Sequence, residues 1–84
     1  VDLLHETISM AGGSSSSSSS LALSCDIGDP AAVQRMAAEV RSALGEVEVL
    51  GNAAGTNAPR RALEVLSPED YHAMINTNLN GAYY

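Results

Sequence analysis

The chain has 84 residues, which is enough for one small domain, and its formal net charge is −6 at pH 7. Its four basic residues are all arginines, and this acidic balance argues against nucleic acid or an anionic membrane surface as a partner. No apolar run approaches the length of a membrane span, and the single cysteine, Cys25, cannot form an internal disulfide. The chain begins at Val1 and ends within a helical pattern at Tyr84, so we expect it to be a fragment of a longer protein.

The first twenty residues carry weak structural signals. Residues 1–4 fit the end of a strand, and residues 5–10 form at most a short helix. Residues 14–20 are a run of seven serines, whose composition is typical of a flexible, linker-like segment. A native linker and a stretch that stands in for other residues both fit this run.

Residues 21–50 predict a strand, a helix and a second strand. The short apolar runs 21–25 and 47–50 are typical of strands buried in a parallel sheet. Between them, Asp29 is placed as a helix N-cap, Pro30 as the first helical residue and Gly45 as the C-terminal stop. A strand, helix and strand in about thirty residues predict a βαβ unit with parallel strands.

The loop after the second strand, residues 51–55, has no large side chain. In a parallel sheet, ligands bind outside the carboxyl ends of the strands. Asp26 leaves the first strand at that edge and Asn52 leaves the second, so we expect a carboxylate and an amide to face one crevice. A loop of small residues lets a flat ligand lie against the backbone, although its glycines could also serve only a tight turn.

The third element is a helix predicted from Pro68 to the end of the chain, with Ser67 as its N-cap. On a regular helix Asn78 falls inside the apolar stripe, whereas Asn76 and Asn80 fall on the solvent side. A buried amide costs about 1–3 kcal/mol unless it finds partners. We therefore predict that Asn78 either bonds the backbone near Asn52 or serves chemistry, and that replacing Asn76 or Asn80 is nearly silent.

Three motifs occur in the order and spacing found in the short-chain dehydrogenase/reductase family. They are Asp26-Ile27 after a strand, Asn52-Ala53-Ala54-Gly55 after the next strand, and Asn78-Leu79-Asn80-Gly81 followed by Tyr83. The chain resembles this family over residues 21–84. The resemblance implies that residues 1–84 are part of an NAD(P)-binding Rossmann-like domain, an α/β fold with a doubly wound parallel sheet.

The resemblance also implies roles for individual residues. The acid matching Asp26 bonds the adenine amino group, with the backbone of Ile27 nearby. The loop of Asn52, Ala53, Ala54 and Gly55 lies along the ribose and nicotinamide of the cofactor. The asparagine matching Asn78 belongs to the catalytic tetrad, where it helps position a water in a proton relay. Asp2, if it closes an earlier strand, matches the acid that favours NAD over NADP.

Several family features are absent from the chain. The glycine-rich phosphate loop would precede Asp2, and a chain without lysine cannot contain the Tyr-x-x-x-Lys pair. Tyr71, Tyr83 and Tyr84 are therefore not candidates for the catalytic tyrosine. Gly51 stands where a branched apolar residue is usual. His5 and His72 are too isolated to form a metal site.

The resemblance implies the middle part of an oxidoreductase that transfers hydride between a nicotinamide and a small carbonyl compound or secondary alcohol. We expect the fragment alone to be inactive, and the full-length protein to be a cytoplasmic homo-oligomer without nucleic acid, membrane or metal. The alternatives are a truncated, non-catalytic module for nucleotide binding or subunit association, and a partial gene product without independent function.

Overall fold

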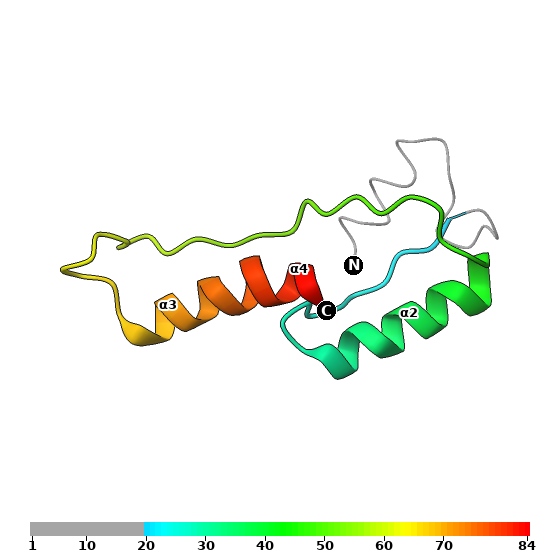
Figure 1. The fold of residues 1–84 in the computed structure, drawn as a ribbon, viewed down its shortest axis with the longest axis horizontal. Helices are drawn as coiled ribbons and strands as arrows, with labels where there is room; N and C mark the ends of the chain where they lie inside the picture. Colours follow the sequence, from blue (N-terminus) through cyan, green and yellow to red (C-terminus); the bar gives the residue numbers. More distant parts are fainter. Residues whose placement is uncertain (1–19) are drawn as a thin grey trace. The chain divides into compact units, whose positions relative to one another are not determined.

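The computed structural model describes residues 20–84, so Asp2 and residues 14–19 of the serine run lie outside the described residues. Its helices are α2 (Pro30–Leu44), α3 (Pro68–Ile75), the π-helix η1 (Asn76–Asn80) and α4 (Gly81–Tyr83). Figure 1 shows α3 and α4 as parts of one continuous helical rod, with η1 between them. Within the described part, no helix combines the length and apolarity needed to cross a membrane.

The chain divides into two compact units, and the division does not follow sequence order. Among the described residues, the first unit contains residues 20–26 and Ala31–Leu50, and the second contains Ile27–Pro30 and Gly51–Tyr84. The short loop Ile27–Pro30 thus belongs with the C-terminal helices rather than with the segment that precedes it. Every predicted site residue after Asp26 lies in the second unit.

Helix α2 forms where local signals predicted it. It begins at Pro30, whose fixed φ suits the first helical position and whose missing N–H costs nothing there. It ends at Leu44 because Gly45 adopts a left-handed conformation with φ of 85° and its N–H bonds the carbonyl of Arg41 at 3.0 Å. Residues of α2 that are half-buried, such as Val33, Met36 and Val40, keep the predicted helical spacing.

The predicted strands are not confirmed. Residues 21–25 and 47–50 are neither helical nor assigned to strand, and within residues 20–84 the structure assigns no strand at all. A strand is defined by ladder hydrogen bonds to a neighbouring strand, and apolar sequence alone does not supply that neighbour. The βαβ unit is therefore present only as its helix with two non-helical flanks.

Helix α3 also begins where predicted. Ser67 is its N-cap, because the Ser67 hydroxyl accepts a hydrogen bond from the Asp70 N–H at 3.1 Å. The helical backbone continues to Tyr83, as expected, but it changes pitch over η1. There the N–H of Gly81 bonds the carbonyl of Asn76, five residues earlier, instead of the carbonyl four residues earlier.

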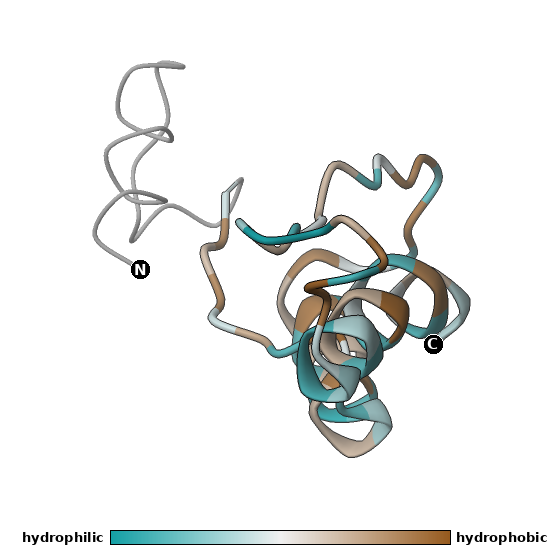
Figure 2. Ribbon diagram, turned by 90° about the vertical axis from the view of Figure 1, so that its left-hand side faces the viewer, coloured by the Kyte–Doolittle hydropathy of each residue, from teal (hydrophilic) through white to brown (hydrophobic). Residues whose placement is uncertain are grey.

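Burial in the described part is slight. Ala58, with 4% of its surface exposed, is the buried apolar residue of residues 20–84. Large apolar side chains stay exposed, among them Val49 (87%), Leu63 (94%) and Tyr83 (86%). Figure 2 shows both hydrophobic and hydrophilic residues along the helices. Hydrogen bonds of asparagine side chains join segments of the second unit that lie 22 and 48 residues apart in the sequence.

Candidate functional site

The amide of Asn78 forms a pair of hydrogen bonds with the backbone of one residue. Its Nδ2 donates to the carbonyl of Thr56 at 2.9 Å, and its Oδ1 accepts from the Thr56 N–H at 2.8 Å. An amide side chain that engages both backbone groups of an extended residue resembles a neighbouring strand in its bonding pattern. Asn78 therefore holds the chain directly after the small-residue loop, which confirms the prediction that its amide bonds the backbone in this region.

The burial predicted for Asn78 is wrong. Asn78 is exposed, and the stripe expected to surround it is exposed as well, with Tyr71 at 49% and Leu79 at 63%. The stripe was derived from a regular helix, and among the described residues the contact of Asn78 with Thr56 does not bury it. The hydrogen bonds of Asn78 rather than its burial distinguish it from its neighbours.

The small-residue loop, residues 51–55, is exposed along its whole length. The side chain of Asn52 bonds within the loop: its Oδ1 accepts a hydrogen bond from the Ala54 N–H at 3.2 Å, as in an Asx-turn. A Cβ added at Gly55 would lie 3.4 Å from Asn78 Oδ1, whereas one added at Gly51 would meet nothing within 4 Å. A side chain at position 55 would thus be in contact with Asn78, while Gly51 stands in open space.

Asn76 holds a second loop of the same unit. Its Nδ2 donates to the carbonyl of Gly28 at 3.1 Å, and its Oδ1 accepts from Asn80 Nδ2 at 3.1 Å. Both ends of the Asn76 amide are therefore engaged, and Asn80 fixes the orientation of Asn76. Asn76 and Asn80 are half-buried. The prediction that they face solvent is therefore wrong, and the prediction that replacing them is nearly silent is left to measurement.

Gly81 lies against the same loop. A Cβ built at Gly81 would come within 2.7 Å of Ile27 Cγ1, 2.8 Å of Ile27 Cδ1 and 3.2 Å of the Ile27 carbonyl oxygen. Real Cβ atoms essentially never come within 3.0 Å of another heavy atom, and 3.2 Å is tight, so a side chain here would require Ile27 to shift. Gly81 has an ordinary right-handed helical conformation, so packing rather than backbone freedom requires the glycine.

Asn76, Asn78 and Asn80 all lie in the π-helix η1. They hold two different loops because helical residues two apart face nearly opposite sides. Asn76, joined to Asn80, bonds Gly28, while Asn78 bonds Thr56. A short π-helical insertion of this kind is frequent at functional sites.

The remaining predicted site residues are placed as follows. Ile27 is half-buried and lies in the second unit with Asn52, Ala53, Ala54, Gly55 and Asn78. Asp26 is exposed and belongs to the first unit, and Asp2 is not among the described residues. Among residues 20–84, no group of three His, Cys, Asp or Glu side chains could hold a metal ion.

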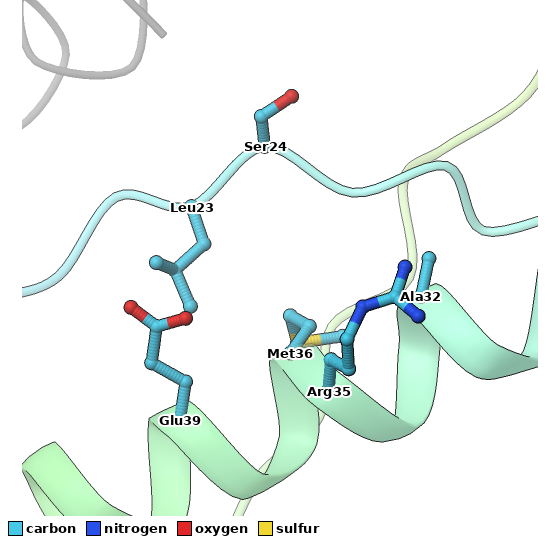
Figure 3. Close-up of a pocket in the computed structure, with 6 residues that line it drawn as sticks. All are labelled: Leu23, Ser24, Ala32, Arg35, Met36 and Glu39. Carbon is cyan, nitrogen blue, oxygen red and sulfur yellow. The ribbon is translucent and has the colours of Figure 1, made fainter.

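A pocket of about 210 Å³ lies within the first unit, between residues 23–24 and α2. In Figure 3 the side chain of Leu23 points toward α2, whereas the hydroxyl of Ser24 points away from it. The other lining residues, Ala32, Arg35, Met36 and Glu39, all come from α2. None of the predicted site residues lines this pocket, so it is a packing gap beside α2 and not the candidate site.

Comparison with known proteins assigns the chain to a family. The model of the short chain dehydrogenases matches residues 2–84. The chain belongs to the short-chain dehydrogenase family. A 3beta-hydroxysteroid dehydrogenase of Mediterraneibacter gnavus is similar to it, with 29% identity over 62 residues. The match covers 74% of this chain but 22% of that relative, and no solved structure matches the chain significantly.

Membership in the family implies a Rossmann-like fold and an NAD(P) cofactor. The loop 51–55 fits such a cofactor, because it is exposed, lacks large side chains and leaves open space at Gly51. Its backbone can therefore be approached closely by a flat group. The hydrogen-bond donors of this loop are backbone N–H groups and the Asn52 amide. Such donors suit the sugar hydroxyls and the carboxamide of a nicotinamide cofactor.

Sequence reasoning did not find Thr56, Gly28 or the role of Asn76 and Asn80. Thr56 and Gly28 contribute backbone atoms, and the identity of a side chain does not indicate that its backbone will be bonded. The bond between Asn80 and Asn76 had a signal, because residues four apart on a helix are neighbours and amide pairs at this spacing interact. The helical wheel places that pair on the solvent side because it does not include the loop Ile27–Pro30, whose Gly28 carbonyl Asn76 bonds.

Proposed function

We propose that the chain forms part of an NAD(P)-dependent oxidoreductase that transfers hydride between a nicotinamide and a small carbonyl compound or secondary alcohol. Family membership supports this class of reaction. The observation that carries the proposal at the level of residues is the double hydrogen bond between Asn78 and Thr56. It ties the residue matching the family's tetrad asparagine to the chain directly after the Asn52–Gly55 loop.

In this proposal Asn78 has two tasks. Its amide fixes Thr56, and through Thr56 the course of the loop that would lie along the ribose and nicotinamide. It also helps position a water in the proton relay that serves the general acid. The relay's lysine does not come from residues 1–84, since they include none. The contribution of this chain is thus to position groups rather than to donate the proton.

The cofactor would be held by residues from both halves of the chain. When bound, the nicotinamide supplies or accepts the hydride. Asp26 and the backbone of Ile27 would bind the adenine, and Asn52, Ala53, Ala54 and Gly55 would line the ribose and nicotinamide. Asp2 would favour NAD over NADP. Residues 21–25 and 47–50 would be the third and fourth strands of the Rossmann-like sheet.

The test uses the complete protein that contains this sequence, with Asn78→Leu as the variant. Leucine has a similar volume but cannot hold Thr56. Reduction of a panel of carbonyl compounds by NADH and NADPH is followed by the loss of reduced-nicotinamide absorbance, and the panel includes a 3-ketosteroid because of the similar steroid dehydrogenase. We expect wild-type turnover and a fall in kcat of about 100-fold in the variant, the lower range for loss of acid–base assistance.

Glu69→Gln is the matched control, because Glu69 is exposed in the first turn of the same helical rod, ahead of the asparagines. It is expected to keep wild-type turnover. Circular dichroism shows whether Asn78→Leu is folded. A folded Asn78→Leu protein with wild-type kcat would remove Asn78 from the proposed relay, and a wild-type protein without turnover on any substrate would contradict the proposed reaction.

A subunit-association module is the second candidate. Tyr71, Leu79 and Tyr83 are exposed on the helical rod, at 49%, 63% and 86%, and such a face is typical of an interface. We propose that the same face joins subunits of a homo-oligomer in the complete protein. Association measured by analytical ultracentrifugation, together with absent turnover, would favour this candidate, whereas turnover by the purified protein would favour the oxidoreductase.

A further inference from the structure

We propose that Asn76, oriented by Asn80, is a positioning residue for the adenine half of the dinucleotide. The inference rests on the proposed function and concerns the loop Ile27–Pro30. This loop directly follows Asp26 and contains Ile27, the two residues proposed to bind adenine. Asn76 touches neither the reacting groups nor, in this proposal, the nucleotide, and it acts through the backbone of the loop.

The first observation is where the loop belongs. Ile27–Pro30 groups with Gly51–Tyr84 and not with the residues that flank it in sequence. A four-residue loop has little apolar surface of its own, and its position must be set by specific contacts. In the described structure, η1 and the first residue of α4 supply two such contacts.

The second observation is the chain of side-chain hydrogen bonds that reaches the loop. Asn80 donates to Asn76 Oδ1 at 3.1 Å, and Asn76 Nδ2 donates to the Gly28 carbonyl at 3.1 Å. Both bonds are partly buried, so water competes for them less than for the exposed Asn78 pair. With its oxygen held by Asn80, the Asn76 amide can present only its N–H group to Gly28.

The third observation is the contact at Gly81. The absence of a side chain at Gly81 lets Ile27 lie directly on the helix. The hydrogen bond fixes the loop at Gly28 and the steric contact fixes it at Ile27, so two consecutive residues are held by one helical turn. A backbone held at two successive residues presents its N–H and carbonyl groups in a fixed direction, which is what recognition of a base edge requires.

The loop therefore links the helix that carries Asn78 to the adenine side of the cofactor. One π-turn holds Thr56 through Asn78 and Gly28 through Asn76. Loss of Asn76 should weaken the binding of ligands that contain adenine and leave ligands without adenine unaffected. Loss of Asn78 should instead weaken the dinucleotide and the mononucleotide alike, because both contain the nicotinamide half.

The experiment compares two ligands in the complete protein: reduced nicotinamide adenine dinucleotide, and reduced nicotinamide mononucleotide, which lacks the adenosine half. Equilibrium fluorescence titration gives Kd for each ligand with wild-type protein, Asn76→Leu, Asn80→Ala and the control Glu69→Gln. We expect Asn76→Leu to weaken dinucleotide binding by about tenfold, the upper range for one hydrogen bond, with no change for the mononucleotide. Asn80→Ala should show the same preference with a smaller change, and Glu69→Gln should show none.

A second readout needs no cofactor. Hydrogen–deuterium exchange at residues 27–31 of the ligand-free protein should be faster in Asn76→Leu than in wild type, while exchange in α2 beyond its first turn stays unchanged. Asn80→Ala provides the same measurements if Asn76→Leu does not fold.

The outcomes separate this inference from the proposed function. Wild-type protein that binds neither ligand overturns the proposed function and this inference together. If the wild-type protein binds both ligands, but the asparagine variants weaken the binding of both equally or of neither, this inference alone is overturned. Unchanged exchange at residues 27–31 in both asparagine variants also overturns it, because the hydrogen bond would then not be holding the loop.

Discussion

Replacing Gly81 by alanine tests the contact between the helical rod and the Ile27 loop. In a helix interior, Gly→Ala ordinarily stabilises by about 0.5–1 kcal/mol, because alanine has less freedom to lose on folding. At Gly81 the new methyl would meet Ile27 Cγ1 at 2.7 Å and the Ile27 carbonyl oxygen at 3.2 Å. The position of Cγ1 is set by χ1, which is stiff in a β-branched residue, so Ile27 cannot simply rotate away.

Overpacking of this kind costs about 1–3 kcal/mol. The mid-range cost of about 2 kcal/mol, less the helical gain, predicts that Gly81→Ala lowers the free energy of unfolding by about 1 kcal/mol. Removing the Ile27 side chain takes away the closest contacts and leaves the carbonyl oxygen. In an Ile27→Ala background, Gly81→Ala should therefore be nearly neutral, which gives a coupling of about 1 kcal/mol between the two positions.

Urea denaturation of the complete protein, followed by circular dichroism, measures the four proteins of this cycle. Gly51→Ala is the control glycine, because a Cβ there meets nothing within 4 Å. If Gly81→Ala stabilises the wild-type background, or if the effects of Gly81→Ala and Ile27→Ala simply add, then Ile27 does not lie on Gly81 and the placement of the loop is wrong.

Three further predictions concern local features of the chain. Gly45→Ala should lower the free energy of unfolding by about 1 kcal/mol, because Gly45 has φ of 85°, and an effect no larger than that of Gly51→Ala would contradict this. Ser67→Ala should cost about 1 kcal/mol through loss of the bond to the Asp70 N–H, whereas Ser67→Asp should retain most of the stability; both are measured by urea denaturation, and equal losses would argue against capping. Asn78→Leu should lower the free energy of unfolding by about 1–2 kcal/mol, because water can replace the lost hydrogen bonds of Thr56. Complete unfolding of this variant by circular dichroism would contradict the prediction and show that the Asn78–Thr56 hydrogen bonds are needed for folding.

The helices could be predicted from sequence because their signals are local. Pro30 and Gly45 bound α2, and Ser67 with Pro68 starts α3, each through the conformation or hydrogen bonds of a few neighbouring residues. No partner from elsewhere in the chain is needed for these signals to act. Both ends of α2 and the start of α3 accordingly lie where the sequence indicated.

The strands could not be predicted in the same way, because a strand depends on its neighbours. In the Rossmann order 3-2-1-4-5-6, the third and fourth strands are separated by the second and first. If residues 21–25 and 47–50 are those strands, they flank a shared crossover helix but do not pair with each other. The apolar pattern therefore predicts α2, but the hydrogen-bond ladder of each strand depends on pairing with strands other than these two.

The roles of the asparagines could be predicted only in part. Family resemblance selected Asn78, and its amide does bond the backbone beside the small-residue loop. The orientation of Asn76 and Asn80 could not be derived, because a helical wheel assumes a constant rotation per residue. The wheel also does not show which other segment packs on a face, and Gly28, 48 residues before Asn76, lies on the side that the wheel assigned to solvent.

The most direct test of the central claim follows the transferred hydrogen itself. The complete protein is incubated with carbonyl substrates and a reduced nicotinamide dinucleotide that carries deuterium at the transferred position. The account predicts that the alcohol product gains deuterium at the former carbonyl carbon, as detected by mass spectrometry. Formation of alcohol without deuterium, or no alcohol from any substrate under conditions where the dinucleotide binds, would contradict it.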